Sequence, residues 1–308
     1  MIEEDIISAL QEAGPMTGGQ LLGRTEEEVF QLWQSCRRSD RVVERIVGRR
    51  FLRLDRTIKG YARLSPSIRR EFQTYTVLGL RRQAVEIEEL SRQLAGQIIK
   101  ISRAKLDLAG QVVKNIISSL KIRDMVRKKT CFILAGDITY EMAHTEPRLE
   151  KSTGRLVLGS DLDLVVVTAD TFPSGALKVL DDAIHTRKYY LLTDPAYREE
   201  IDYIIKPLSR IEEQMRFDKF EAMVACKILR EGVFLSGSEA IFLEVNKLLA
   251  KHRIPERLDH LEERAREYRL KAENCLRDLK TAPIESEFSN LFFTKEERLE
   301  EAFNGRIY

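Results

Sequence analysis

From roughly Ser67 to Lys129 the sequence contains few residues that break a helix, and this long stretch constrains the fold more than any other feature. Its apolar residues, such as Leu90, Leu94 and Ile98, recur at spacings of mostly three and four, which places them on one helix face. The pattern predicts one long helix, or two helices with a break near Gly110, linking a front domain to the rest of the chain. A dimerising helix and a helix packed within its own monomer carry the same stripe, so both alternatives stay open.

The residues before this stretch predict a small helical unit followed by a β-hairpin. Ile2–Ala13 has the apolar spacing of an amphipathic helix, and Thr25 with Glu28 forms the capping-box pattern that opens another helix. The short apolar runs Val42–Ile46 and Arg50–Leu54 are separated by a glycine, which indicates two strands joined by a turn. Helices followed by a hairpin in this order resemble a winged helix-turn-helix.

Composition and length set the broad class. The chain has 308 residues, of which 43% are hydrophobic, and this suffices for two or three domains with buried cores. No apolar stretch is long enough to cross a bilayer and the first residues are acidic, so we expect a cytoplasmic protein without a membrane partner. The cysteines lack the spacing of a zinc site or a disulfide framework, and we expect buried thiols at Cys36, Cys131, Cys226 and Cys275.

The chain changes character after residue 129. Three short apolar runs, Cys131–Ala135, Leu162–Thr168 and Ile201–Ile205, predict strands, and Ser174–Tyr190 predicts a helix. From Pro207 onward the pattern is helical again. This order predicts a small mixed sheet flanked by helices, and the whole chain is expected to be an α+β protein.

The sharpest chemical signal is the segment Gly159-Ser160-Asp161-Leu162-Asp163. Alternate side chains of a strand share a face, so Asp161 and Asp163 project together while Leu162 points the other way. Two neighbouring carboxylates repel each other unless a cation lies between them, and hard oxygen ligands suit Mg²⁺ bound to a triphosphate. The alternative is that both acids lie at an exposed strand end, where they need no ligand.

Two further segments place this motif in a larger pattern. The strand Cys131–Ala135 runs into Gly136, where a backbone can approach a phosphate closely, and Asp202 lies on a later apolar strand. A strand with a glycine turn, then an Asp-x-Asp strand, then a third acid on a following strand resemble the DNA polymerase β-like nucleotidyltransferase superfamily. The resemblance covers roughly residues 115–245 and rests on separate pieces of sequence in the right order.

The resemblance implies a metal-dependent enzyme that moves a nucleoside monophosphate from a nucleoside triphosphate to an acceptor. Its acids would hold Mg²⁺ or Mn²⁺, and the third acid would also help to deprotonate the attacking hydroxyl as pyrophosphate leaves. The metal-binding and catalytic residues would be Asp161, Asp163 and Asp202. The residues that contact or border the nucleotide would be Gly136, Asp137, Ser160 and Lys206. The expected segments are a winged-helix-like domain (1–72), a linker of one or two helices (73–128), the nucleotidyltransferase-like domain (129–207) and a C-terminal helical bundle (208–308).

Two departures from the family pattern favour a second interpretation. Asp137 stands where the family has a serine, and an anion there repels a triphosphate unless a cation compensates. The gap from Gly136 to Asp161 is longer than in the family, because Glu146–Gly159 forms an inserted loop or a lengthened hairpin. The alternative function is a nucleic-acid-binding regulator whose nucleotidyltransferase-like domain senses nucleotide or is inactive. The acceptor and the preferred base stay open.

The front domain carries a dense basic cluster between Ser35 and Arg70. The cluster covers the end of the predicted recognition helix and the wing, where a winged helix contacts the DNA backbone. The arginines expected to bind nucleic acid are Arg37, Arg38, Arg41, Arg45, Arg49, Arg50 and Arg53. Two alternatives stay open, namely pairing with acids elsewhere on the chain, such as Glu86 and Glu88, and docking of a protein partner.

Overall fold

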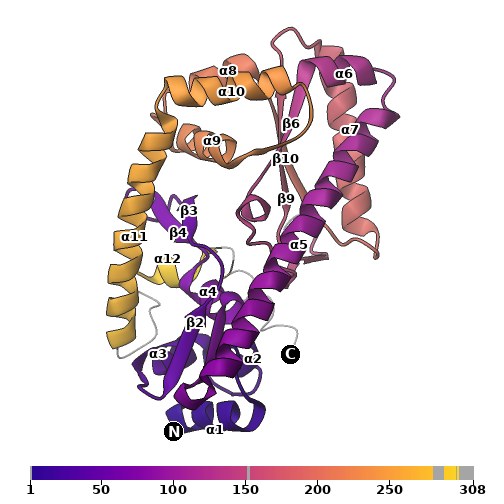
Figure 1. Cartoon of the computed structure of the whole chain (residues 1–308). Helices are drawn as coiled ribbons and strands as arrows, with labels where there is room; N and C mark the ends of the chain where they lie inside the picture. The colour runs from indigo at the N-terminus through magenta and orange to yellow at the C-terminus, as the bar shows by residue number, and fades with distance from the viewer. Residues whose placement is uncertain (1, 151–152, 280–287, 296, 298–308) are drawn as a thin grey trace. The chain divides into compact units, whose positions relative to one another are not determined.

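The computed structural model describes residues 2–150, 153–279, 288–295 and 297 (Figure 1). Within these residues, helices combine with four small sheets, so the expected α+β class is confirmed. The chain divides into two compact units: residues 1–98 together with 260–308 form unit 1, and residues 99–259 form unit 2. None of the described helices combines the length and apolar character needed to cross a bilayer.

Unit 1 contains a three-stranded antiparallel sheet in the order β1-β5-β2. Leu10, Trp33 and Phe72 from its helices share one core with Leu78 of the sheet. The helices that lie wholly in this unit are α1 (Ile2–Ala13), α2 (Gly18–Leu22), α3 (Val29–Arg38), α4 (Ile68–Tyr75) and α12 (Ser289–Phe292). Its strands are β1 (Met16–Thr17), β2 (Val42–Ile46), β3 (Phe51–Leu54), β4 (Ala62–Ser65) and β5 (Thr76–Leu80), and the 3-10 turn η1 (Arg81–Gln83) follows them.

The expected hairpin between residues 42–46 and 50–54 is wrong. Strand β2 pairs with β5, with Val42 opposite Leu80 and Ile46 opposite Thr76, whereas β3 pairs with β4. The partner β5 lies inside the stretch that the sequence predicted to be helical. Its short strand pattern, which includes Thr76 and Val77, was not recognised because residues on either side have helical spacing. Pairing between strands about 30 residues apart is set by tertiary packing, which local propensity does not report.

Helix α5 (Ala84–Ser119) confirms the expected long helix, although it begins later than predicted. Of the two alternatives, the single helix is confirmed at Gly110, because α5 runs through that residue; a single glycine costs a helix only about 1 kcal/mol. The interruption comes after Ser119, before α6 (Arg123–Lys129). Val112 and Val113 of the apolar stripe are buried in the core of unit 2, so packing within the monomer accounts for them, and a dimer through this helix stays a prediction.

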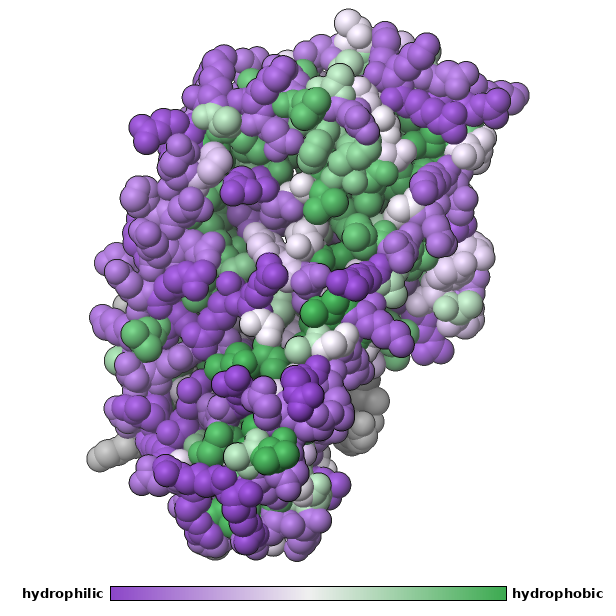
Figure 2. All heavy atoms as spheres, in the orientation of Figure 1, coloured by the Kyte–Doolittle hydropathy of each residue, from purple (hydrophilic) through white to green (hydrophobic). Residues whose placement is uncertain are grey.

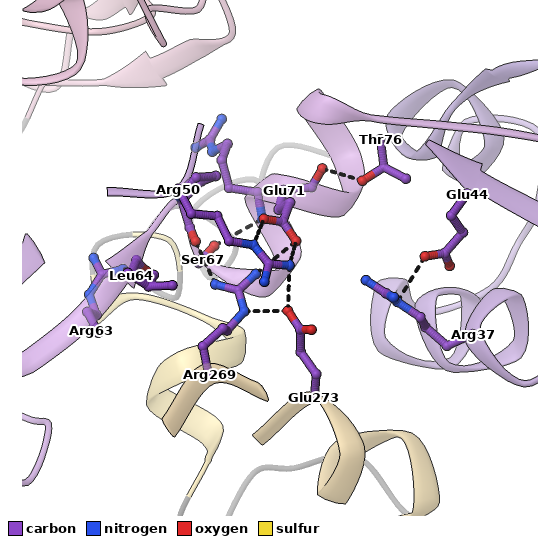
Figure 3. Close-up of polar contacts among 12 residues, drawn as sticks. Arg37, Glu44, Arg50, Arg63, Leu64, Ser67, Glu71, Thr76, Arg269 and Glu273 are labelled. Carbon is purple, nitrogen blue, oxygen red and sulfur yellow. Dashed lines mark hydrogen bonds and ion pairs between the residues drawn. The ribbon is translucent and has the colours of Figure 1, made fainter. Parts of the chain in front are cut away.

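Helix α11 (Ile254–Asp278) belongs to unit 1 from residue 260 onward, rather than to a bundle spanning residues 208–308. A buried network of arginines and glutamates joins it to that unit (Figure 3). Arg269, only 1% exposed, donates to Glu71 of α4 (3.1 Å) and to Glu273 (2.6 Å), and Arg50 donates to both carboxylates. Burial alone would raise the pKa of Glu71, but Arg269 and Arg50 outweigh it and hold that pKa below its ordinary value.

Unit 2 contains a four-stranded sheet in the order β10-β9-β6-β11, in which β9 runs parallel to β10 and antiparallel to β6. Its strands and 3-10 turn are β6 (Thr130–Ala135), η2 (Asp137–Tyr140), β7 (Pro147–Leu149), β8 (Leu156–Leu158), β9 (Leu162–Thr168), β10 (Ile201–Pro207) and β11 (Val233–Gly237). The helices are α7 (Ser174–Thr193), α8 (Leu208–Gln214), α9 (Phe220–Glu231) and α10 (Glu239–Lys251), besides α6 and the second half of α5. Strands β7 and β8 pair as a hairpin, as expected for the inserted segment.

The sheet of unit 2 has a helical layer on each face. Phe132, Leu164 and Val166 share one core with Val113 of α5 and Leu180 of α7. Helices α9 and α10 contact β6 and pack with each other. Figure 2 shows apolar surface in the region where Figure 1 draws the strands of this unit. Ile204 on the edge strand β10 is 45% exposed.

Three of the cysteines are buried, as expected, and one is not. Burial raises the pKa of the Cys131 and Cys226 thiols to about 12, which keeps them protonated and inert at neutral pH. Cys36 is also buried, whereas Cys275 is exposed because it falls outside the buried stripe that Ala272 and Leu276 form on α11.

Candidate functional site

Two of the predicted acids lie side by side on neighbouring strands. Asp163 is the second residue of β9 and Asp202 is the second residue of β10, and the parallel register pairs them directly. Neighbouring strands lie about 4.8 Å apart and paired residues point to the same face. Asp163 is half-buried and Asp202 is exposed, so the pair lies at the accessible starting end of these two strands.

The glycine turn lies on the other side of Asp163. Ala135, the last residue of β6, pairs with Asp163, and Gly136 follows with a φ of +81°. A Cβ on Gly136 would lie 2.1 Å from Oδ2 of Asp163. Position 136 therefore favours glycine for two reasons: its φ is positive, and the Asp163 carboxylate packs against its Cα.

Asp137 and Ser160 join the turn to the segment that precedes the acids. The Ser160 hydroxyl donates to Oδ2 of Asp137 (3.4 Å) and accepts from the backbone N–H of His144 (3.3 Å). The backbone N–H of Ser160 donates to the carbonyl of His144 (3.1 Å), and Gly159 permits this approach because a Cβ there would lie 1.7 Å from that oxygen. The two segments that the sequence proposed as a phosphate turn and a site border are thus in direct contact.

Asp161, the residue just before β9, belongs to a cluster of charged residues around Arg148. Its carboxylate forms an ion pair with Arg148 of β7, which also contacts Glu200 (2.8 Å) and donates to the carbonyl of Gly159 (3.0 Å). Within the part of the chain that the structure describes, no group of three or more histidine, cysteine or acidic side chains is arranged to hold a metal ion. The structure therefore brings together Asp163 and Asp202, with Asp161 nearby in sequence but neutralised by an arginine.

The donor set formed by Asp163 and Asp202 fits Mg²⁺ that arrives with a nucleotide. Magnesium sites of this kind use one or two protein carboxylates and complete the coordination shell with substrate phosphates and water. Both residues offer only hard oxygen ligands, and Asp202 is exposed to solvent. They do not form a closed cage that would retain a resident metal by itself.

The sequence prediction missed Glu231 and Lys227 of α9. The backbone N–H of Gly136 donates to Oε1 of Glu231 (3.1 Å), and the other oxygen forms an ion pair with Lys227. The ammonium of Lys227 also lies 5.4 Å from the ring centroid of Tyr140 in η2. The i, i+4 spacing of lysine and glutamate was visible in the sequence, but it is typical of any helix surface and did not indicate that the pair faces the turn.

A second buried pair supports the same end of β9 and β10 from α5. Lys105, 4% exposed, donates to the carbonyl of Leu158 (2.9 Å) and to Oε2 of Glu199 (2.6 Å). Burial lowers the pKa of Lys105 and raises the pKa of Glu199, and the mutual attraction of the pair opposes both shifts. This pair anchors the residues just before Asp161 and just before Asp202 to the long helix.

Lys206 does not lie with the acids. It follows Asp202 by four residues along β10 and pairs with Val167, near the opposite end of the strand, about 13 Å away. Its ammonium donates to the side chain of Gln214 (3.1 Å), and burial lowers its pKa. The expected phosphate contact of Lys206 is therefore not supported by its position.

Most of the arginines proposed to bind nucleic acid have partners within unit 1. Arg37 pairs with Glu44 (2.9 Å), Arg41 with Glu4 (2.7 Å) and Arg45 with Glu88 (3.6 Å). Arg50 belongs to the buried network, and Arg38 donates to the backbone carbonyls of Arg277 and Leu279. These contacts reduce the positive charge that the cluster offers to a phosphate backbone, although Arg45, Arg49 and Arg53 are exposed.

The chain was compared with known proteins. No protein-family model, curated protein or solved structure matches it.

Proposed function

We propose that unit 2 is a metal-dependent nucleotidyltransferase domain, which moves a nucleoside monophosphate from a nucleoside triphosphate to an acceptor. The observation that carries the proposal is the pairing of Asp163 with Asp202 beside the Gly136 turn. Two carboxylates at the accessible end of neighbouring strands, next to a turn that begins with a glycine, form a site suited to a metal-bound triphosphate.

The order of elements supports the proposal. A strand ending in a glycine turn (β6) lies antiparallel to the Asp-x-Asp strand (β9), which lies parallel to the strand of the third acid (β10). This is the succession of pieces for which the sequence resembles the DNA polymerase β-like superfamily. Helix α7 supplies the crossover between the two parallel strands, as parallel pairing requires.

The roles of the residues follow from their positions. Asp163 and Asp202 would hold Mg²⁺, which when bound offsets the charge of the triphosphate and favours departure of pyrophosphate. Asp202 is the more exposed of the two, and this supports a role in which it would accept the proton of an acceptor hydroxyl. Gly136 keeps the turn close to Asp163, and Ser160 holds the Asp137 side chain in place.

The direct test is pyrophosphate release by the full chain with Mg²⁺ and each of the four nucleoside triphosphates. Asp163→Asn and Asp202→Asn keep the shape of the side chain and remove its charge, and we expect release to fall by at least about 100-fold. Asp170→Asn is the matched control, because Asp170 lies just beyond the far end of β9 and its oxygen can still accept from the backbone of Ser209. Equal rates in all three variants would refute the proposal.

A second function is favoured by specific observations. Asp161 is paired with Arg148, and the N–H of Gly136 is occupied by Glu231, so two parts of the site are engaged internally. In unit 1, helices packed with the antiparallel sheet β1-β5-β2 support a winged-helix-like domain, although the hairpin expected at residues 42–54 is not formed. The second candidate is therefore a nucleic-acid-binding regulator whose unit 2 binds nucleotide without turnover.

The two functions differ in what they require of the arginines and of the acids. The regulator predicts DNA binding that weakens steeply with salt and is lost in Arg45→Gln, Arg49→Gln or Arg53→Gln. It also predicts that the protein binds nucleotide but releases no pyrophosphate. The enzyme predicts pyrophosphate release that these substitutions leave unchanged.

A further inference from the structure

The backbone N–H of Gly136 is already occupied by an anion that belongs to the protein. Oε1 of Glu231 accepts from it at 3.1 Å, and the Glu231 side chain is only 4% exposed. The carboxylate reaches this turn from the last residue of α9, in a different segment of the chain. A backbone N–H at a glycine turn is the group that phosphate oxygens accept from in nucleotide sites.

The position of Glu231 is unfavourable for a carboxylate. The C-terminal end of a helix carries a partial negative charge, and burial removes the water that would otherwise solvate the acid. Lys227, one turn earlier on the same helix and 12% exposed, offsets part of this cost through its ion pair. A buried ion pair of this kind contributes little to the stability of the fold. We therefore look for a functional role of Glu231 and Lys227.

The N–H of Gly136 and the ammonium of Lys227 form together a small anion site. Tyr140 of η2 lies beside the ammonium, so the lysine is held near the turn rather than extended into solvent. A carboxylate and a terminal phosphate both present oxygens that accept from these donors, and the phosphate carries more charge. The two anions therefore compete for one place.

We propose that Glu231 is an internal anion that closes the phosphate-binding turn, and that the terminal phosphate of an incoming triphosphate displaces it. In the open state Gly136 and Lys227 bind the phosphate, and the Glu231 side chain withdraws. This inference rests on the proposed function, because it assigns the triphosphate to the turn beside Asp163. To that function the inference adds Glu231, which opposes triphosphate binding, and Lys227, which supports it.

The test measures binding of Mg²⁺–tripolyphosphate to the full chain by calorimetry, because this probe has no base and needs no acceptor. Glu231→Gln keeps an oxygen for the Gly136 N–H but removes the charge, and we expect the Kd to fall about tenfold, the scale of one charge-assisted hydrogen bond. Adding Lys227→Met in the double variant should cancel this gain. The double variant removes both buried charges together, so it avoids leaving either one uncompensated.

Matched controls make the same charge changes at exposed positions of unit 2. Glu213→Gln lies on α8 and Lys247→Met on α10, and both residues are exposed. Neither should change the Kd by more than about twofold. Thermal unfolding of each variant establishes that the compared proteins are folded.

The possible outcomes separate this inference from the proposed function. If Glu231→Gln binds tripolyphosphate as the wild type does, or if the double variant binds as tightly as Glu231→Gln, the internal-anion proposal is overturned. When that result accompanies normal pyrophosphate release that depends on Asp163, the proposed function stands without it. If neither the wild type nor any variant binds tripolyphosphate or a nucleoside triphosphate, both proposals fail.

Discussion

Replacing Gly136 with alanine tests how closely the turn and the acid pair depend on each other. The new Cβ would lie 2.1 Å from Oδ2 of Asp163 and 3.2 Å from its Cγ. A relaxed contact between carbon and oxygen is about 3.3 Å or more, so roughly 1 Å of overlap has to be relieved. The Gly136 backbone, with φ +81° and ψ −161°, lies in a region that is open almost only to glycine and adds about 1–3 kcal/mol of strain for alanine.

Either the turn or the Asp163 carboxylate must move by about the amount of the overlap. A misplacement of about 1 Å at a reacting centre costs about 100-fold in rate, so we expect Gly136→Ala to lower pyrophosphate release by that factor. The free energy of unfolding should fall by about 1–3 kcal/mol from backbone strain, with any unrelieved overlap adding to the loss. Pyrophosphate release and urea unfolding of the same preparation measure the two effects.

Gly14 provides the matched control, because its φ is +79° and a Cβ there would have no neighbour within 4 Å. Gly14→Ala should show the backbone strain in urea unfolding and keep normal pyrophosphate release. If Gly136→Ala releases pyrophosphate as fast as Gly14→Ala, the packing of the turn against Asp163 has no catalytic meaning and the reasoning fails.

Three further predictions concern charges that the structure buries. Arg269→Met should lower the free energy of unfolding by about 3–5 kcal/mol in urea titrations, because it leaves Arg50 as the partner of two buried glutamates that now share two arginines, whereas the exposed Arg266→Met should have little effect. Burial, opposed by Arg37, raises the pKa of Glu44 from 4.5 to about 7, so the folded state holds this proton more tightly than the unfolded state. The contribution of Glu44 to stability is therefore lost as pH rises from about 4.5 to about 7, by up to about 3 kcal/mol, and Glu44→Gln should remove that part of the pH dependence in unfolding measurements at pH 5 and pH 7.5. Arg148→Met should lower the free energy of unfolding by about 1–3 kcal/mol in the same assay, because it removes the cation that Asp161 and Glu200 share; an unchanged value would show that the hairpin is not anchored by this residue.

The sequence placed Asp163 and Asp202 at the start of two apolar strands, but strand alternation suggested Asp161 as the neighbour of Asp163, and Asp202 was added by the family resemblance. Asp163 and Asp202 each stand at the second position of an apolar run, and a helix between the runs implies parallel neighbours. The same reasoning placed Gly136 at the end of the preceding strand, where the structure also has it. These features follow from local patterns and from the rules that connect adjacent elements.

The remaining contacts could not be predicted because they join residues far apart in the chain. Glu231 reaches Gly136 from 95 residues away, and Arg148 reaches Glu200 across 52 residues. The hairpin expected at residues 42–54 failed for the same reason, since its first strand pairs with β5 instead. Charged residues on amphipathic helices look alike in sequence, whether they face solvent or a turn.

The most direct measurement for the central claim is the rate of pyrophosphate release in wild type, Asp163→Asn, Asp202→Asn and the double variant. If the two carboxylates act together on one metal-bound triphosphate, each single substitution removes most of the activity and the double variant is hardly slower than either. Additive losses, in which each substitution acts independently, or single variants as fast as wild type, would contradict the account.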